Sequence, residues 1–150
     1  LTNLALLYKH QSRYDEAIQC LSKVLAINPE STEAHNNLGC IYKEKGCYAE
    51  AIEQFSTVLA INPHDLEVLN NIACTYKAHG DLETAQKYFE QAYTLNPYDE
   101  TINYNLGITY AERRMTTKAV EQFKNYLAHT QDGYHTDQVT VWIQLLEKKG

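Results

Sequence analysis

The sequence predicts an all-α fold in which one helical hairpin is repeated four times along the chain. The first observation is the spacing of the three prolines, Pro29, Pro63 and Pro97, which lie 34 residues apart and each follow an asparagine. The second is that apolar residues recur at i, i+3 and i+4 in both halves of this unit, which is the period of an amphipathic helix. The third is that Asn-Pro ends each of the first three units, and proline cannot continue a helix and disfavours helical geometry in the residue before it.

At several positions, residues that lie 34 apart carry side chains of similar size. Small residues occupy two such columns, Ala5, Gly39, Ala73 and Gly107, and Ala17, Ala51, Ala85 and Ala119. Large apolar residues occupy a third column, Leu21, Phe55, Phe89 and Phe123. We therefore expect the two helices of each hairpin to cross closely at the small residues, with the large side chain beside the crossing.

The helices of the four hairpins are predicted, in chain order, at 1–11 and 14–27, 32–45 and 48–61, 66–79 and 82–95, and 100–113 and 116–129. In the first hairpin, Tyr14 and Ile18 lie on the predicted core face. Ser31 or Thr32 is expected to cap the next hairpin, since a side-chain oxygen there can accept from the free N–H groups of the first turn.

The third hairpin has the clearest end signals. Asp65 and Asp81 are expected to cap its two helices, and Gly80 is expected to form the turn between them, as Gly46 does in the second hairpin.

The end of the chain departs from the repeat. Arg113 and Arg114 replace the glycine or serine of the other turns, and Gln131 replaces the proline. A loop is predicted from Thr130 to His135, followed by a helix at 137–149. Its Trp142 lies five residues later than the 34-residue period requires, so the helix is either a cap on the last hairpin or the start of a displaced fifth repeat.

These columns resemble those of the tetratricopeptide repeat (TPR) family, whose unit is a 34-residue helical hairpin. The resemblance implies a single TPR domain over 1–150 in the form of a right-handed superhelix. Its repeats would span about 1–31, 32–65, 66–99 and 100–131, followed by the helix at 137–149. The tryptophan common at the start of such units is missing, since its column reads Leu1, His35, Leu69 and Asn103. In this family the first helix of each hairpin lines a concave inner wall.

The first helices carry the candidate binding residues. Candidates for a peptide-binding groove are Asn3, Asn36, Asn37, Asn70, Asn71, Tyr104, Asn105, Lys9, Lys43, Lys77, Cys40, Cys74 and Ile108. Asparagine is a poor helix former, so a column of four needs a reason. An amide can bind peptide main chain, and the column resembles the asparagine ladder in the TPR arm of O-linked N-acetylglucosamine transferase. The alternative is that these amides bind the neighbouring repeat and stabilise the stack.

The lysine column would add a cationic stripe that favours an acidic ligand if it faces the groove. Alternatively, the lysines are ordinary solvated surface residues. The carboxylate clamp known in this family needs lysine and asparagine in the first repeat, but the chain has Thr2 and Leu6 there, so this activity is not expected.

Composition limits the classes of function. The net charge of −6 disfavours a nucleic-acid partner, and no apolar run reaches the roughly 20 residues of a membrane span. The four cysteines lack the paired spacing of a zinc site and are expected to be reduced, as in the cytoplasm. No catalytic constellation, metal site or cofactor is expected.

The sequence begins at Leu1 and is expected to be a fragment. We expect a module that binds a protein or peptide, with two alternatives: a substrate-recruitment arm of a larger enzyme such as a glycosyltransferase, or a module that forms homo-oligomers through its repeat ends.

Overall fold

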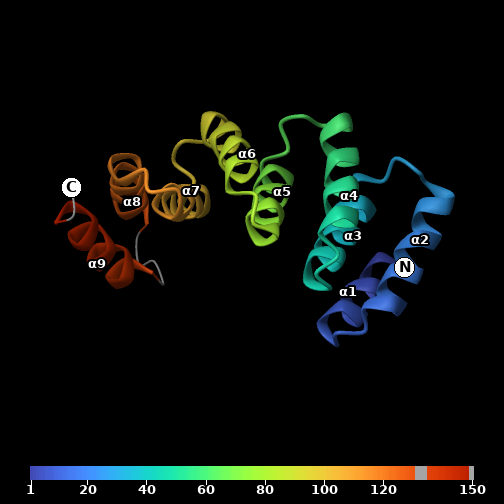
Figure 1. Ribbon diagram of the computed structural model, residues 1–150. Coiled ribbons are helices and arrows are strands. Elements are labelled where there is room, and N and C mark those ends of the chain that lie inside the picture. Colours follow the sequence, from blue (N-terminus) through green and yellow to red (C-terminus); the bar gives the residue numbers. More distant parts are fainter. Residues whose placement is uncertain (131–134, 149–150) are drawn as a thin grey trace.

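The structure is a computed structural model that describes residues 1–130 and 135–148, and these form nine α-helices (Figure 1). The helices are α1 (Thr2–His10), α2 (Tyr14–Ile27), α3 (Thr32–Glu44), α4 (Tyr48–Ile61), α5 (Leu66–His79), α6 (Leu82–Leu95), α7 (Glu100–Glu112), α8 (Thr116–His129) and α9 (Thr136–Glu147). The predicted all-α fold is confirmed. Most of the loop predicted between Thr130 and His135, with Gly133, lies outside the described residues, as do Lys149 and Gly150.

Each hairpin is held together where a small residue of its first helix faces a large residue of its second. A Cβ atom added to Gly39 would stand 2.5 Å from the ring of Phe55, and one added to Gly107 would stand 2.6 Å from the ring of Phe123. Both distances are far shorter than a carbon–carbon contact allows. The prediction that the small columns mark close helix crossings is therefore confirmed at these two positions.

The hairpins form a curved row (Figure 1). The second helix of each hairpin packs on the first helix of the next, and α3 also approaches α1 and α5, while α5 approaches α7. Within the described residues, no such approach joins the even-numbered helices α2, α4, α6 and α8 to one another. The odd-numbered helices α1 to α7 therefore lie on the inner side of the curve.

The turn inside each hairpin contains one residue in the left-handed region. Gly46 and Gly80 have φ of 78° and 93°, and the equivalent positions hold Ser12 and Arg114, with φ of 57° and 60°. Arg114 thus keeps the turn geometry that the sequence alone made doubtful. A side chain here costs conformational energy that glycine avoids.

We expect Arg114→Gly to raise the free energy of unfolding by up to about 1 kcal/mol, because the relief of strain exceeds the added freedom of the unfolded chain. The matched change Gly80→Ala is expected to lower it by a similar amount. Urea unfolding followed by circular dichroism measures both. Effects of the same sign in the two variants would contradict the assigned turn geometry.

The first helices of the second, third and fourth hairpins begin at side-chain caps. Ser31 Oγ accepts a hydrogen bond from the Ala34 N–H, and Asp65 and Asp99 accept from the N–H groups three residues on. Asp81 caps α6 in the same way, and this backbone hydrogen bond from Thr84 lowers the pKa of its carboxyl group. The caps at Ser31, Asp65 and Asp81 were predicted, whereas Asp99 was not recognised from the sequence.

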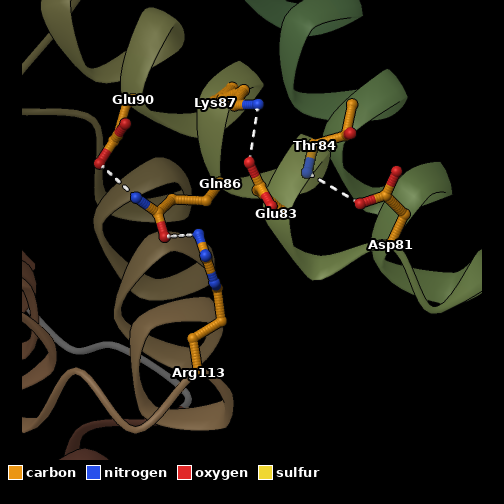
Figure 2. A network of polar contacts seen from close by, with 7 residues as sticks. All are labelled: Asp81, Glu83, Thr84, Gln86, Lys87, Glu90 and Arg113. Atoms are coloured by element: carbon orange, nitrogen blue, oxygen red, sulfur yellow. Dashed lines mark hydrogen bonds and ion pairs between the residues drawn. The ribbon is translucent and has the colours of Figure 1, made fainter.

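A polar network joins the third hairpin to the fourth (Figure 2). The nearly buried Gln86 of α6 donates to Glu90 Oε1 at 2.8 Å and accepts from Arg113, which follows α7. Tyr110 OH donates to the same Glu90 oxygen at 2.7 Å. Burial, together with this bond to the carboxylate, raises the pKa of Tyr110 far above its usual range. Arg113, irregular in the sequence, therefore helps to fix how the fourth hairpin sits on the third.

The last helix, α9, packs against α8 through Val139 and Ile143, both buried, and through Trp142, whose ring centroid lies 5.6 Å from that of Phe123. Tyr126 of α8 is buried under Tyr104 of α7. Within the described residues, the backbone of α9 does not approach α7 as α7 approaches α5. The spacing of successive first helices therefore widens at this end.

Candidate functional site

The candidate binding residues lie on α1, α3, α5 and α7, the helices of the inner side. Two hollows lie beside them, where the helices begin. One, of about 240 Å³, lies between α3 and α5 and is lined by Glu33, Asn36 and Glu67 among others. The next, of about 370 Å³, lies between α5 and α7 beside Asn70. The inner side therefore repeats one hollow at neighbouring hairpins.

The asparagines of neighbouring hairpins bind one another. Asn71 Nδ2 donates to Asn36 Oδ1 at 3.3 Å, and Asn105 Nδ2 donates to Asn70 Oδ1 at 3.1 Å. Asn36 Nδ2 donates in turn to Glu67 Oε1 at 2.9 Å. These are the bonds expected if the amides stabilise the stack. In the described part of the chain, the side-chain oxygens of Asn71 and Asn105 accept no hydrogen bond.

Asn37 is the exception in the second hairpin. The pairs join residues 35 positions apart, so the partner of Asn37 would be residue 2, which is Thr2 rather than asparagine. No side-chain hydrogen bond of Asn37 occurs among the described residues, and the same holds for Asn3. Because Asn37 is half-buried, its amide has lost part of its contact with water without gaining a protein partner.

The lysine column shows the same irregularity at the same hairpin. Lys9 Nζ lies 3.0 Å from Glu44, and Lys77 Nζ lies 3.6 Å from Glu112. By the same spacing, the partner of Lys43 would be residue 78, which is an alanine. Lys43 forms no ion pair within residues 1–130 and 135–148, unlike Lys9 and Lys77, although Glu44 and Glu67 lie close enough to act on the neighbouring Cys40.

The two cysteines of the column are not poised for reaction. Cys40 and Cys74 are free thiols, and burial raises the pKa of both. Raised pKa values keep the thiols protonated, and Asn105 Nδ2 lies 3.9 Å from Cys74 Sγ. These side chains therefore contribute weakly polar surface to the inner face.

The last two candidates lie at the end of the row. Tyr104 stands where the second and third hairpins have Asn36 and Asn70, and it stacks on His135 and Trp142 with centroid distances of 4.4 and 6.2 Å. Ile108, in the column of the cysteines, lines an apolar hollow beside α9. The inner face thus changes from polar to apolar at its C-terminal end.

Two further features are absent from the described ranges. No cluster of three histidine, cysteine or acidic side chains is arranged to hold a metal ion there. None of the helices in these ranges combines the length and the apolar character that crossing a membrane requires.

The fold is shared with several solved structures. The chain superposes on MamA with a TM-score of 0.85 at 21% identity, covering 97% of this chain and 83% of MamA. It superposes on PilF of Pseudomonas aeruginosa with a TM-score of 0.85 at 25% identity, covering 99% and 66% of the two chains. YrrB, described as a TPR protein with an unusual peptide-binding site, gives a TM-score of 0.79 at 21% identity, with 99% and 75% covered.

Family models agree with these superpositions, although no curated protein sequence matches the chain. Tetratricopeptide repeat models match residues 30–97 and 70–134, and a TPR repeat model matches residues 5–46. Together these matches cover all four hairpins, in agreement with the 34-residue columns. The chain belongs to the tetratricopeptide repeat family.

Proposed function

We propose that this protein is an interaction module that binds an extended peptide segment of a partner protein along the inner face of α3, α5 and α7. One observation carries the proposal. Asn37 and Lys43, both on α3, have no partner in the described part of the chain, while their counterparts on the following helices are paired. Among the described residues, the second hairpin therefore presents a side-chain amide without a hydrogen-bond partner and a lysine without an ion-pair partner.

These two groups suit different parts of a peptide. The amide of Asn37 can donate and accept, and an extended main chain offers both complements at each residue. The free oxygens of Asn71 and Asn105 continue this row of acceptors along the next two helices. Main-chain bonds of this kind do not depend on the peptide sequence.

Lys43 supplies the selectivity. It is half-buried, and a charge partly shielded from water acts more strongly on a ligand than a fully solvated one. It is flanked by Cys40 and Cys74, whose protonated thiols do not neutralise it. We therefore propose a preference for segments that place an acidic residue against α3. Peptide binding by YrrB, which has the same fold, agrees with this proposal.

The test uses fluorescein-labelled degenerate peptide pools, one rich in glutamate and one rich in lysine. Asn37→Ala is expected to weaken binding of every pool that binds by about 2- to 10-fold, since one hydrogen bond contributes about 0.5–1.5 kcal/mol. Lys43→Ala is expected to weaken the acidic pool selectively and to flatten its salt dependence. Fluorescence anisotropy at two salt concentrations measures both effects.

Lys77→Ala is the matched control, because this lysine lies in the same column but is already paired with Glu112. We expect it to change the affinity for the acidic pool less than Lys43→Ala does. The proposal is wrong if both α3 variants bind like the wild type while changes at the exposed Glu53 and Lys87, on α4 and α6, abolish binding.

A further inference from the structure

An apolar pocket of about 250 Å³ opens at the C-terminal end of the inner face. Its walls are Ile108 and Ala111 of α7, Phe123 of α8, and Trp142, Leu145 and Leu146 of α9. Glu112 is the charged residue of the lining, and its carboxylate lies 3.6 Å from Lys77. The pocket is therefore a hydrophobic hollow with a partly neutralised rim.

The pocket exists because α9 does not repeat the packing of the earlier hairpins. Each of α3, α5 and α7 approaches the preceding first helix, whereas α9 contacts α8 and its backbone stays away from α7. The rings of Tyr104 and Trp142, with centroids 6.2 Å apart, bridge part of the gap. The rest of the gap is not filled by side chains of the described residues.

The pocket continues the candidate binding face. Ile108 lies in the column of Cys40 and Cys74, and Ala111 lies in the column of Lys43 and Lys77. The same two rows that present thiols and lysines to the groove therefore present apolar side chains here. A peptide that follows the inner face would pass from polar surface onto this pocket.

We propose that the pocket takes one bulky apolar side chain, such as leucine or phenylalanine, from the peptide that the inner face binds. This inference rests on the proposed function. A cavity of about 150 Å³ is large enough for benzene, so the volume found here suffices for one such side chain. An apolar lining of this kind excludes a charged or polar occupant, because burying such a group without partners is costly.

The position of the pocket sets the spacing within the ligand. The pocket lies beside α7, and Lys43 lies on α3, so two helix-to-helix steps of about 8–10 Å each separate them. An extended chain advances about 3.3–3.6 Å per residue, which places the two anchors roughly five or six residues apart. The favoured peptide therefore carries an acidic residue and a bulky apolar residue at this separation.

Trp142 is the single tryptophan of the chain and lines the pocket, so its fluorescence reports occupancy directly. The probes are degenerate peptide pools with glutamate fixed at one position and leucine or alanine fixed five or six residues away, in both chain orders. The leucine pools are expected to bind about tenfold more tightly than the alanine pools and to shift the Trp142 emission.

Two variants of α9 make a matched pair. Leu145 and Val141 are both 51% exposed, but Leu145 lines the pocket and Val141 does not. Leu145→Glu is expected to remove the preference for leucine, and Val141→Glu is expected to retain it. Circular dichroism of both variants checks that the helices remain folded.

The outcomes separate this inference from the proposed function. If the pools bind and respond to Asn37→Ala and Lys43→Ala, but the leucine and alanine pools bind equally, the groove is supported and the pocket proposal is overturned. A leucine preference that survives Leu145→Glu also overturns it, because the apolar anchor then binds elsewhere.

A small probe tests the pocket even if no pool binds. Millimolar N-acetyl-leucinamide is expected to shift the Trp142 emission of the wild type but not of Leu145→Glu, and N-acetyl-glycinamide is expected to have no effect. Absence of a shift with the leucine derivative would overturn the proposal. A shift of the Trp142 emission with protein concentration alone, lost in both α9 variants, would instead assign the surface to a second copy of the chain and would also overturn it.

Discussion

Phe89→Ala is expected to lower the free energy of unfolding by about 3–5 kcal/mol, the usual cost of removing a fully buried phenylalanine. Phe89 of α6 is 0% exposed and lies in the core cluster that spans the third and fourth hairpins, with Ala73, Leu106 and Phe123. Because each hairpin is stabilised by its neighbours, a cavity here weakens two hairpins at once. Urea unfolding followed by circular dichroism measures the change.

The control is Glu50→Ala, a change at an exposed position of α4 that is expected to cost less than about 0.5 kcal/mol. A broadened transition in Phe89→Ala would show that the third hairpin has become uncoupled from its neighbours. A loss below about 1 kcal/mol would contradict the central position of Phe89 in the core.

The sign of the stability change caused by Gly39→Ala shows whether packing or helix propensity dominates at this position. Alanine is the better helix former by about 1 kcal/mol, so propensity alone predicts stabilisation. The added Cβ would instead stand 2.5 Å from the Phe55 ring, and overpacking of this kind costs about 1–3 kcal/mol. We therefore expect a net loss of stability, and a larger one for Gly39→Leu.

A double-mutant cycle identifies the cause. Phe55→Leu removes the ring that the new Cβ would meet, so adding Gly39→Ala to Phe55→Leu is expected to cost less than adding it to the wild type. Equal costs in the two backgrounds would mean that the crossing of α3 and α4 is not where the columns place it.

The fold was predictable because the 34-residue spacing and the residues that end helices agree over most of the chain. The Asn-Pro steps, the turn glycines and the small columns each indicate the same hairpin, and the helices begin and end close to the predicted residues. From the sequence, Arg113 could be recognised only as a departure from the repeat pattern, and its role could not be predicted. Its bond to Gln86 depends on how α6 and α7 pack, and that arrangement cannot be derived from one column.

The helices that carry the candidate residues could be predicted, whereas the bonds between these residues could not. Residues that share a column lie on equivalent turns, which placed the asparagines and lysines on the inner helices. The bonds, however, join residues 35 positions apart, because successive helices are offset by one residue where they meet. Only this offset shows that Thr2 and Ala78 leave Asn37 and Lys43 without partners.

The pocket beside α9 was beyond sequence reasoning for a related reason. The late position of Trp142 indicates that the repeat is interrupted, but it does not say whether the gap is filled. The spacing of α7 and α9 decides this, and it follows from the packing of Tyr104, Phe123 and Trp142 together.

The most direct test of the central claim is the response of the side-chain amide signals of ¹⁵N-labelled protein to the acidic peptide pool. Asn37 lies on the inner face, while Gln19 and Gln91 lie exposed on α2 and α6, so one nuclear magnetic resonance spectrum reports both sides. The Asn37→Ala spectrum assigns the Asn37 signal. We predict that Asn37 shifts on titration while Gln19 and Gln91 do not, and shifts confined to Gln19 and Gln91 would contradict binding in the groove.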